Sequence, residues 1–342
     1  MNILLLLAGI LVVAVTLLDA LWTTLWPEGH AGPIVNWATF GIHGLFKRLA
    51  GGARRRASGA RVNHRLLSVE GPVTLVAGVL LWVALLWTGW TLIFSAGPAA
   101  IVGSHSHAPA NGAERIYFTG YVLFTLGNGD FAPLGAGWQI ATAVASLTGL
   151  LLISLTVTYL LSALGAVVTK RAFASQVIAL GASPADFVCH AWDGRGFGAL
   201  DLQLLSLAEQ LGRVTQQHRA YPMLHYYHST EERTAVPAAV AVLDDALTLL
   251  SFGVAPDCRP APTPLRVTRE TVRGYLDTVH QAHVGPADVP PAPPDLENLR
   301  RAAIPTVSED AFAAAVGELG ERRRLLRGIL ESEARQWPSG RS

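Results

Sequence analysis

The sequence predicts an all-α membrane protein whose first half crosses the bilayer and whose second half forms an α-helical domain. The 342 residues are 51% hydrophobic and only 15% charged, whereas soluble proteins usually carry nearer a quarter charged residues. The apolar residues are concentrated in the first half, in three runs long enough to span a bilayer. In the second half, apolar residues recur at helical spacing and few strand patterns occur.

Residues 3–26 form the first apolar run. A signal peptide would begin with basic residues and end in a small-residue cleavage site, and neither is evident, so we expect a retained transmembrane helix. Asp19 lies inside this run. Two interpretations stay open: a carboxylate close to the lipid headgroups, or an intramembrane acid paired with another helix.

Residues 34–49 carry apolar and small side chains at the i, i+3, i+4, i+7 spacing of an amphipathic helix. Such a helix is expected to lie in the membrane interface rather than to cross the bilayer. The basic residues that end and follow it are Lys47, Arg48, Arg54, Arg55 and Arg56. Basic residues beside a hydrophobic segment indicate the cytoplasmic side.

The next two spans are joined by a loop and a short helical segment. In order, the expected elements are a helix over 72–95, a loop over 96–113, a short helix over 114–124 and a helix over 138–169. Lys170 and Arg171 are expected to end the last helix. Basic residues thus flank both outer ends of this unit, so both ends should be cytoplasmic and the connecting loop should enter from outside.

Between the short helix and the last span the chain reads Thr125-Leu126-Gly127-Asn128-Gly129-Asp130. Glycine at alternate positions permits torsions that aim successive carbonyls the same way. A ladder of carbonyl oxygens can replace the hydration shell of an ion. Irregular backbone at membrane depth is tolerated only where protein buries it or where it lines a wet cavity. The alternative is a simple tight turn, since Asn-Gly is a strong turn dipeptide.

Residues 72–170 resemble the two-helix pore unit of the tetrameric potassium-channel family, with outer helix, pore helix, filter and inner helix. This resemblance implies a potassium-channel-like pore whose filter holds potassium ions and which needs no other cofactor. It assigns roles to seven residues: the innermost cation site to Thr125, the carbonyl ladder to Leu126, Gly127, Asn128 and Gly129, the outer-mouth acid to Asp130, and an inner-helix hinge to Gly149.

Three residues depart from the pattern of the family. Phe124 takes the place of a first threonine, Leu126 that of a valine, and Asn128 that of an aromatic residue. In the family that aromatic braces the filter, and asparagine does not provide the same packing. Any bracing neighbours are expected on the pore helix, at Phe118 and Tyr121. We therefore expect conduction of monovalent cations, with potassium as the expected ion and modest selectivity.

These inferences divide the chain into an N-terminal transmembrane helix (1–33), an interfacial helix with a basic linker (34–65), a pore domain (66–172) and a cytoplasmic helical domain (173–342). One filter loop per chain implies a homotetramer. We expect a multi-pass protein of the plasma membrane, with the lipid bilayer and its own copies as partners. A net charge of +1 argues against nucleic-acid binding.

The alternative function is a non-conducting membrane sensor or scaffold built on a degenerate pore unit, which the departures at Phe124 and Asn128 keep open. An enzyme has no support, because no catalytic constellation is evident.

The second half is expected to contain helices over 200–217, 236–252, 268–283, 295–303 and 308–335. Thr306 and Glu309 have the spacing of a capping box at the start of the last helix. The proline-rich residues 286–294 predict an extended spacer.

Three patterns in the chain could indicate ligands, and each has a simpler interpretation. Residues 194–199 fit a loose dinucleotide pattern, but no strand precedes them and no acid follows at the required distance, so an interhelical turn is expected. No third metal ligand is evident near His225 and His228, so packed core or interface histidines are expected there. His105 and His107 could bind a metal or sense pH in the extracellular loop, but a solvated loop is expected. Cys189 and Cys258 form no metal motif.

Overall fold

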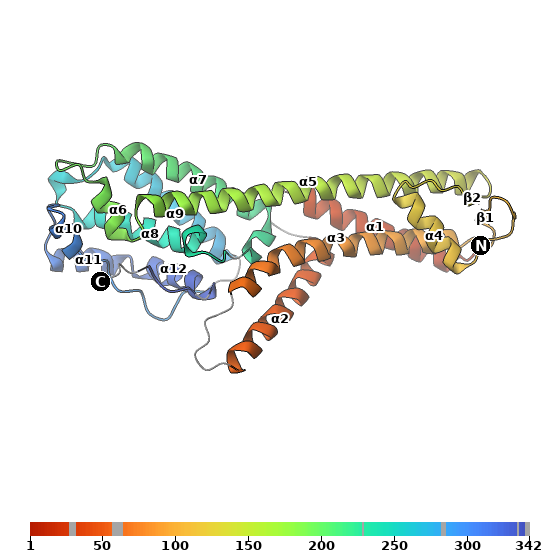
Figure 1. Ribbon diagram of the computed structural model, residues 1–342, viewed down its shortest axis with the longest axis horizontal. Helices are drawn as coiled ribbons and strands as arrows, with labels where there is room; N and C mark the ends of the chain where they lie inside the picture. Colours follow the sequence, from red (N-terminus) through yellow and green to blue (C-terminus); the bar gives the residue numbers. More distant parts are fainter. Residues whose placement is uncertain (27–31, 57–63, 228, 282–284, 334, 339–342) are drawn as a thin grey trace. The chain divides into compact units, whose positions relative to one another are not determined.

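A computed structural model describes residues 1–26, 32–56, 64–227, 229–281, 285–333 and 335–338 (Figure 1). The chain forms two compact units. The first consists of Met1–Gly51 with Pro72–Ala163, and the second of Gly52–Gly71 with Leu164–Ser342. A long helix, α5 (Ala136–Leu180), contributes to both.

The first unit is built from long apolar helices, as the sequence predicts. In addition to α5 it contains α1 (Ile3–Leu25), most of α2 (Pro33–Arg56), most of α3 (His64–Ser95) and α4 (Gly112–Leu123). Helix α1, residues Ser68–Ser95 of α3, and α5 are long and apolar enough to cross a membrane. Helix α2 is not among the candidate spans found in the described residues. The predicted all-α membrane fold is confirmed.

The core of this unit consists of aromatic side chains from α3 and α4. Phe94 stacks on Trp90 with ring centroids 5.7 Å apart and meets Phe118 edge-on at 5.2 Å. Such geometries suit the quadrupoles of aromatic rings. Helix α1 packs closely on α3, because a Cβ added at Gly9 would lie 2.6 Å from the carbonyl oxygen of Gly89. Small residues at such crossings let membrane helices approach each other closely.

Two predictions for the first half were wrong in detail. Helix α3 begins at His64 rather than at Pro72, which lies inside it. The apolar run marks only the part suited to lipid, and a helix can extend beyond it with polar residues. The expected loop over 96–113 contains strand β1 (Ile101–Gly103), which pairs in antiparallel register with β2 (Phe131–Pro133).

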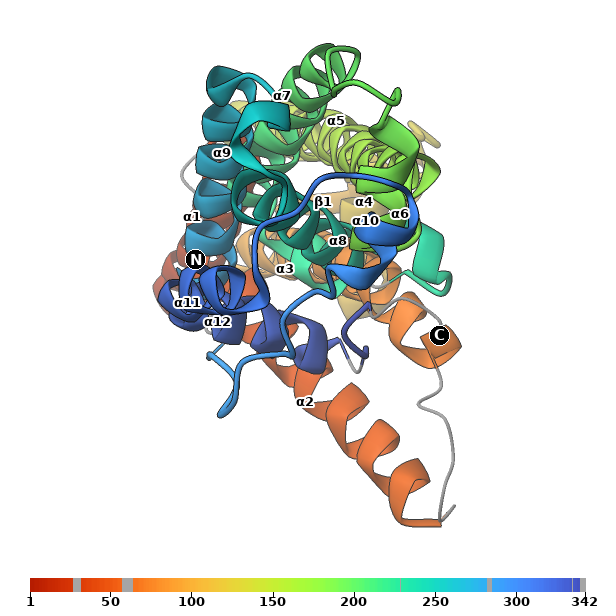
Figure 2. The ribbon, with the colours of Figure 1, turned by 90° about the vertical axis from the view of Figure 1, so that its left-hand side faces the viewer.

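The second unit encloses an apolar helix, α8 (Val236–Thr248), all of whose residues are buried. It is surrounded by α6 (Pro184–Ala191), α9 (Pro262–Gln281) and α12 (Gly320–Ser332), with α7 (Leu200–Ala220) packed on α9 (Figure 2). Residues Val236–Gly253 are apolar enough to cross a membrane, but 89% of their most apolar window is buried within the protein. We therefore treat α8 as a core helix of the second unit.

The remaining elements of this unit are short. They are the turns η1 (Pro222–Tyr226), η2 (Glu232–Thr234), η3 (Leu249–Gly253) and η4 (Pro256–Cys258), and the helices α10 (Glu297–Arg301) and α11 (Glu309–Glu318). As predicted, residues 286–294 form no helix or strand. They are held to α12, because Arg324 and Arg323 donate hydrogen bonds to the carbonyls of Ala287 and Ala292.

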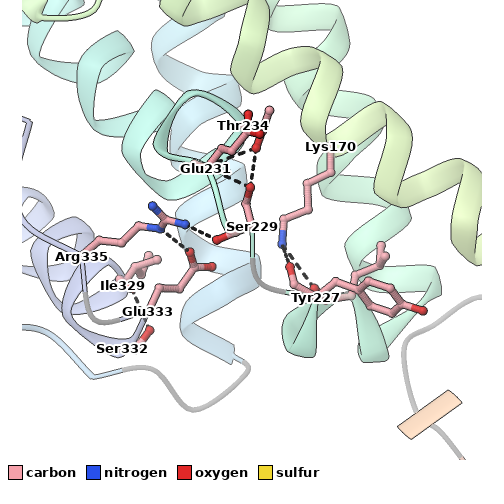
Figure 3. A network of polar contacts seen from close by, with 10 residues as sticks. Lys170, Tyr227, Ser229, Glu231, Thr234, Ile329, Ser332, Glu333 and Arg335 are labelled. Atoms are coloured by element: carbon pink, nitrogen blue, oxygen red, sulfur yellow. Dashed lines mark hydrogen bonds and ion pairs between the residues drawn. The ribbon is translucent and has the colours of Figure 1, made fainter. Parts of the chain in front are cut away.

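Lys170 and Arg171 do not end the helix that precedes them, contrary to expectation. Helix α5 continues to Leu180, because Phe173, Ala174 and Val177 join the core of the second unit. The side chain of Lys170 is buried, and its ammonium donates hydrogen bonds to the carbonyls of Leu224 and Tyr227, each at 3.3 Å (Figure 3). A basic residue thus occupies a protein interior where the sequence predicted an exposed helix end.

The predicted helix over 308–335 is two helices, since Leu319 separates α11 from α12. Ser308, rather than Thr306, caps α11 by accepting a hydrogen bond from the amide of Ala311. Thr306 instead accepts a bond from Arg300. The capping-box prediction failed because Ser308 also has a capping side chain and lies directly before the first helical residue.

Candidate functional site

The site begins at the end of α4. Asn111 and Glu114 form a capping box that fixes the start of this helix. Its buried face includes Phe118, Tyr121 and Leu123, which belong to the core of the first unit. The carboxyl end of a helix carries a partial negative charge, which favours cations. Helix α4 ends directly before the loop over residues 125–130, which we call the 125–130 loop.

Backbone torsions in the 125–130 loop alternate in sign. Thr125, Gly127 and Gly129 have φ values of +56°, +62° and +80°. A positive φ is easy for glycine and unusual for threonine, so the conformation at Thr125 is strained. The amide of Leu126 returns to the carbonyl of Tyr121 at 2.8 Å, which fixes the loop to α4. All six residues of the loop are exposed in the single chain.

A tyrosine of α4 connects the two polar side chains of this loop. The side-chain amide of Asn128 donates to the hydroxyl of Tyr117 at 2.6 Å, and that hydroxyl donates to the carboxylate of Asp130 at 2.9 Å. The expected neighbours, Phe118 and Tyr121, have other partners: Phe118 packs on Phe94, and the Tyr121 hydroxyl donates to the carbonyl of Phe131 at 2.6 Å. Asn128 is therefore held by a hydrogen bond where the sequence predicted a missing brace.

The strand pair supports the other side of the loop. Ser104, which follows β1, donates its hydroxyl to the carbonyl of Gly129 at 2.5 Å, and its amide donates to the carbonyl of Asp130 at 2.9 Å. The Gly129 carbonyl thus already has one protein partner. Sequence reasoning missed Ser104 and Tyr117. The β-branched pair Ile101-Val102 was the available signal for a strand here.

Phe124, the first departure from the family pattern, has a packing role. Its ring meets Trp87 of α3 edge-on, with centroids 5.5 Å apart. Trp87 also lies against Gly120, where an added Cβ would be 2.6 Å from the indole ring. The aromatic residue therefore joins the end of α4 to the outer helix.

The elements around the 125–130 loop lie within residues that match a known protein family. A family model described as "Ion channel" matches residues 79–166, which run from α3 through the 125–130 loop into α5. The chain is also 40% identical over 331 residues to "Uncharacterized membrane protein YdjJ" of Bacillus subtilis (strain 168), covering 97% of this chain and 94% of that protein. The chain belongs to the YdjJ family. Its membrane half contains a potassium-channel-like ion-channel domain. No solved structure gives a significant match.

The predicted ligand patterns of this YdjJ-family chain gain no support from their surroundings. Residues 194–199 follow α6 rather than a strand, and Asp193 closes the turn by accepting from the amides of Arg195 and Gly196. This is the expected interhelical turn. His105 and His107 lie in an exposed turn, also as expected. His228 and the side chain of His225 lie outside the described residues. Within the described part of the chain, no three potential metal ligands lie together.

Gly149, the predicted hinge, lies where α5 crosses the end of α4. A Cβ added there would be 2.2 Å from the carbonyl oxygen of Leu123. Helix α5 continues unbroken past this point. The structure thus gives the glycine a packing role, and the hinge stays a prediction.

We expect Gly149→Ala to destabilise the YdjJ-family pore domain by about 1–3 kcal/mol, because the methyl group forces the two helices apart. Thermal unfolding in detergent measures this. The matched control is Gly165→Ala in the same helix, where an added Cβ meets open space and alanine favours the helix. A Gly149→Ala protein as stable as the parent, but with altered channel opening, would support the hinge instead.

Proposed function

We propose that this protein is a homotetrameric channel for monovalent cations, with potassium as the expected ion, and that ions pass along Thr125–Gly129. The main support is that left-handed torsions occur at every second residue of the loop, at Thr125, Gly127 and Gly129. The loop directly follows the carboxyl end of a helix and lies between two candidate spans. Alternating torsions allow neighbouring carbonyls to share one direction, as an ion ladder requires. We propose that potassium ions bind along this loop during conduction, and we propose no cofactor.

A tetramer follows from the single loop in each chain, because one strand of carbonyls cannot surround an ion. The exposed side chains of the loop and a row of exposed apolar residues on α5 are compatible with contacts to further copies or to lipid. The large members of that row include Ile140, Val144, Leu147, Leu151, Leu161 and Val168. Native mass spectrometry should detect a species of four chains; only monomers or dimers under every detergent condition would rule out this assembly.

The second unit is proposed to be cytoplasmic, in a protein of the plasma membrane. The support is the sequence position of the basic residues: those at 47–56 precede the two spans of α3 and α5, and those at 170–171 follow them. With this orientation, the 125–130 loop enters the membrane from outside.

The direct test is ion flux in liposomes that contain the purified protein, under potassium, sodium and chloride gradients. We expect cation flux without chloride flux, and a reversal potential that favours potassium modestly. Flux absent under all three gradients would favour the non-conducting sensor or scaffold. The observation that favours this second function is the bond from Ser104 to the Gly129 carbonyl, which commits one carbonyl of the ladder.

Tyr117→Phe should lower the preference for potassium over sodium. The variant keeps the ring but removes the hydroxyl that joins Asn128 to Asp130. Each lost hydrogen bond contributes about 1 kcal/mol, so the loop should become looser and discriminate less by size. Reversal potentials measure this change. Adding Asn128→Ala to Tyr117→Phe should have little further effect; full additivity would mean that the two side chains act independently.

A further inference from the structure

The carboxylate of Asp19, inside helix α1, holds the start of helix α2. Asp19 is only 3% exposed. One carboxylate oxygen accepts a hydrogen bond from the backbone amide of Ile34 at 2.8 Å, and the other accepts from the indole of Trp82 on α3, also at 2.8 Å. Asp19 is therefore bonded to groups of two other helices, while its depth in the bilayer, within the membrane or near the headgroups, stays a prediction.

A second pair of contacts tightens the same junction. The amide of Gly32 donates to the hydroxyl of Thr23 at 2.8 Å. Gly32 also lies so close to Asp19 that an added Cβ would be 2.2 Å from its carboxylate. The first amides of a helix lack partners within the helix and carry partial positive charge. Asp19 thus caps α2 from a different helix and fixes where α2 begins.

Beyond this fixed start, α2 presents large apolar side chains to the outside. Trp37, Phe40 and Leu45 are 76%, 62% and 55% exposed. Gly41 and Gly44 have open space around them. The helix carries five basic residues and no acidic residue. Its basic residues are Lys47, Arg48, Arg54, Arg55 and Arg56.

We propose that α2 is a docking helix for the acidic phospholipid headgroups of the cytoplasmic leaflet, and that Asp19 is the fixed point from which it extends. Aromatic and leucine side chains on one face suit insertion to headgroup depth. Juxtamembrane basic residues are attracted by anionic lipids. A second copy of α2 would be repelled, because a helix with five basic and no acidic residues has no complementary charge to offer its copy. The proposal does not require that ions pass through the protein.

The test uses the full chain in lipid nanodiscs. Cys189 and Cys258, the two native cysteines, are changed to serine, and Gly44→Cys carries a fluorophore whose quenching by aqueous acrylamide is measured. Acrylamide is neutral, so the lipid charge does not alter its local concentration. We expect several-fold weaker quenching in nanodiscs that contain phosphatidylglycerol than in pure phosphatidylcholine.

Changing Arg54, Arg55 and Arg56 together to glutamine should abolish this difference, because three lost charges reduce the ratio of bound to free α2 by about a hundredfold. The matched control changes three exposed arginines of the second unit to glutamine and should keep the difference. These are Arg213, Arg273 and Arg301. Equal quenching in the two lipids would overturn the proposal, whether the label is exposed in both or shielded in both by a neighbouring chain.

Asp19→Asn tests the fixed point. Its neutral side chain can accept only one of the two bonds, and even a retained bond from Ile34 is weaker without the charge, so quenching in phosphatidylglycerol should increase and the Ile34 amide should exchange hydrogen faster. Trp82→Phe keeps the carboxylate and its bond to Ile34, and should change the exchange at Ile34 less. If Asp19→Asn fails to fold, the comparison of quenching in the two lipids still tests the proposal. Unchanged exchange at Ile34 in a folded Asp19→Asn protein would show that the charge of Asp19 does not hold α2.

Discussion

Gly127→Ala is expected to abolish cation flux while the chain still inserts and assembles. Gly127 has a φ of +62°, and an added Cβ would meet no atom of the same chain within 4 Å. The effect therefore comes from the backbone: a residue with a Cβ opposes the left-handed torsion and turns a carbonyl away from the ladder. Flux assays in liposomes, with size-exclusion chromatography for assembly, measure both parts of this result.

The matched control is Gly137→Ala. Gly137 lies in the first turn of α5, has open space around it and lacks a positive φ. Alanine is compatible with a helix there, so flux should stay at the level of the parent. If Gly127→Ala conducts as the parent does, ions do not pass along the 125–130 loop, and the proposed channel function fails at that site.

Arg323→Met is expected to cost the second unit about 3–5 kcal/mol, because it leaves a buried carboxylate without its partner. The side chains of Arg323 and Asp245 are 1% and 2% exposed, and they form an ion pair between α12 and α8. The indole of Trp337 also donates to Asp245, at 3.2 Å. Adding Asp245→Asn should recover part of the loss. Thermal or denaturant unfolding in detergent measures these differences.

The loss should depend on pH. Burial raises the pKa of Asp245 to about 7, because desolvation outweighs the attraction of Arg323. The folded protein thus binds a proton at Asp245 more tightly than the unfolded chain does. Protonated Asp245 therefore stabilises the fold at low pH, and this stabilisation is lost as pH rises through about 7. Arg323→Met should raise the pKa of Asp245 further, because the attraction of the guanidinium is lost. The destabilisation caused by this substitution should therefore grow from mildly acidic to alkaline pH.

The control for this pair is Arg213→Met, which removes an exposed ion pair with Glu209 on α7. Exposed pairs of this kind contribute less than about 1 kcal/mol, so a small change independent of pH is expected. A loss from Arg323→Met that is equally small would show that Asp245 does not need a charged partner.

The sequence alone was sufficient to identify the membrane fold and the 125–130 loop. The length of an apolar run reflects bilayer thickness, and the spacing of Gly127 and Gly129 reflects backbone torsion. Both are local properties of the sequence and do not depend on contacts with other elements. Element boundaries were less certain, as Pro72 and Leu319 show, because a helix ends where packing and capping decide rather than where apolarity changes.

Only the tertiary structure decided which partners complete these elements. Asn128 is bonded to Tyr117, Gly149 faces the carbonyl of Leu123, and Asp19 is shared between Ile34 and Trp82. The residues joined by these hydrogen bonds lie between 11 and 63 positions apart in sequence. Sequence periodicity assigns a residue to the face of an element. It does not determine which side chain of another element that face meets, because the meeting depends on how whole helices pack.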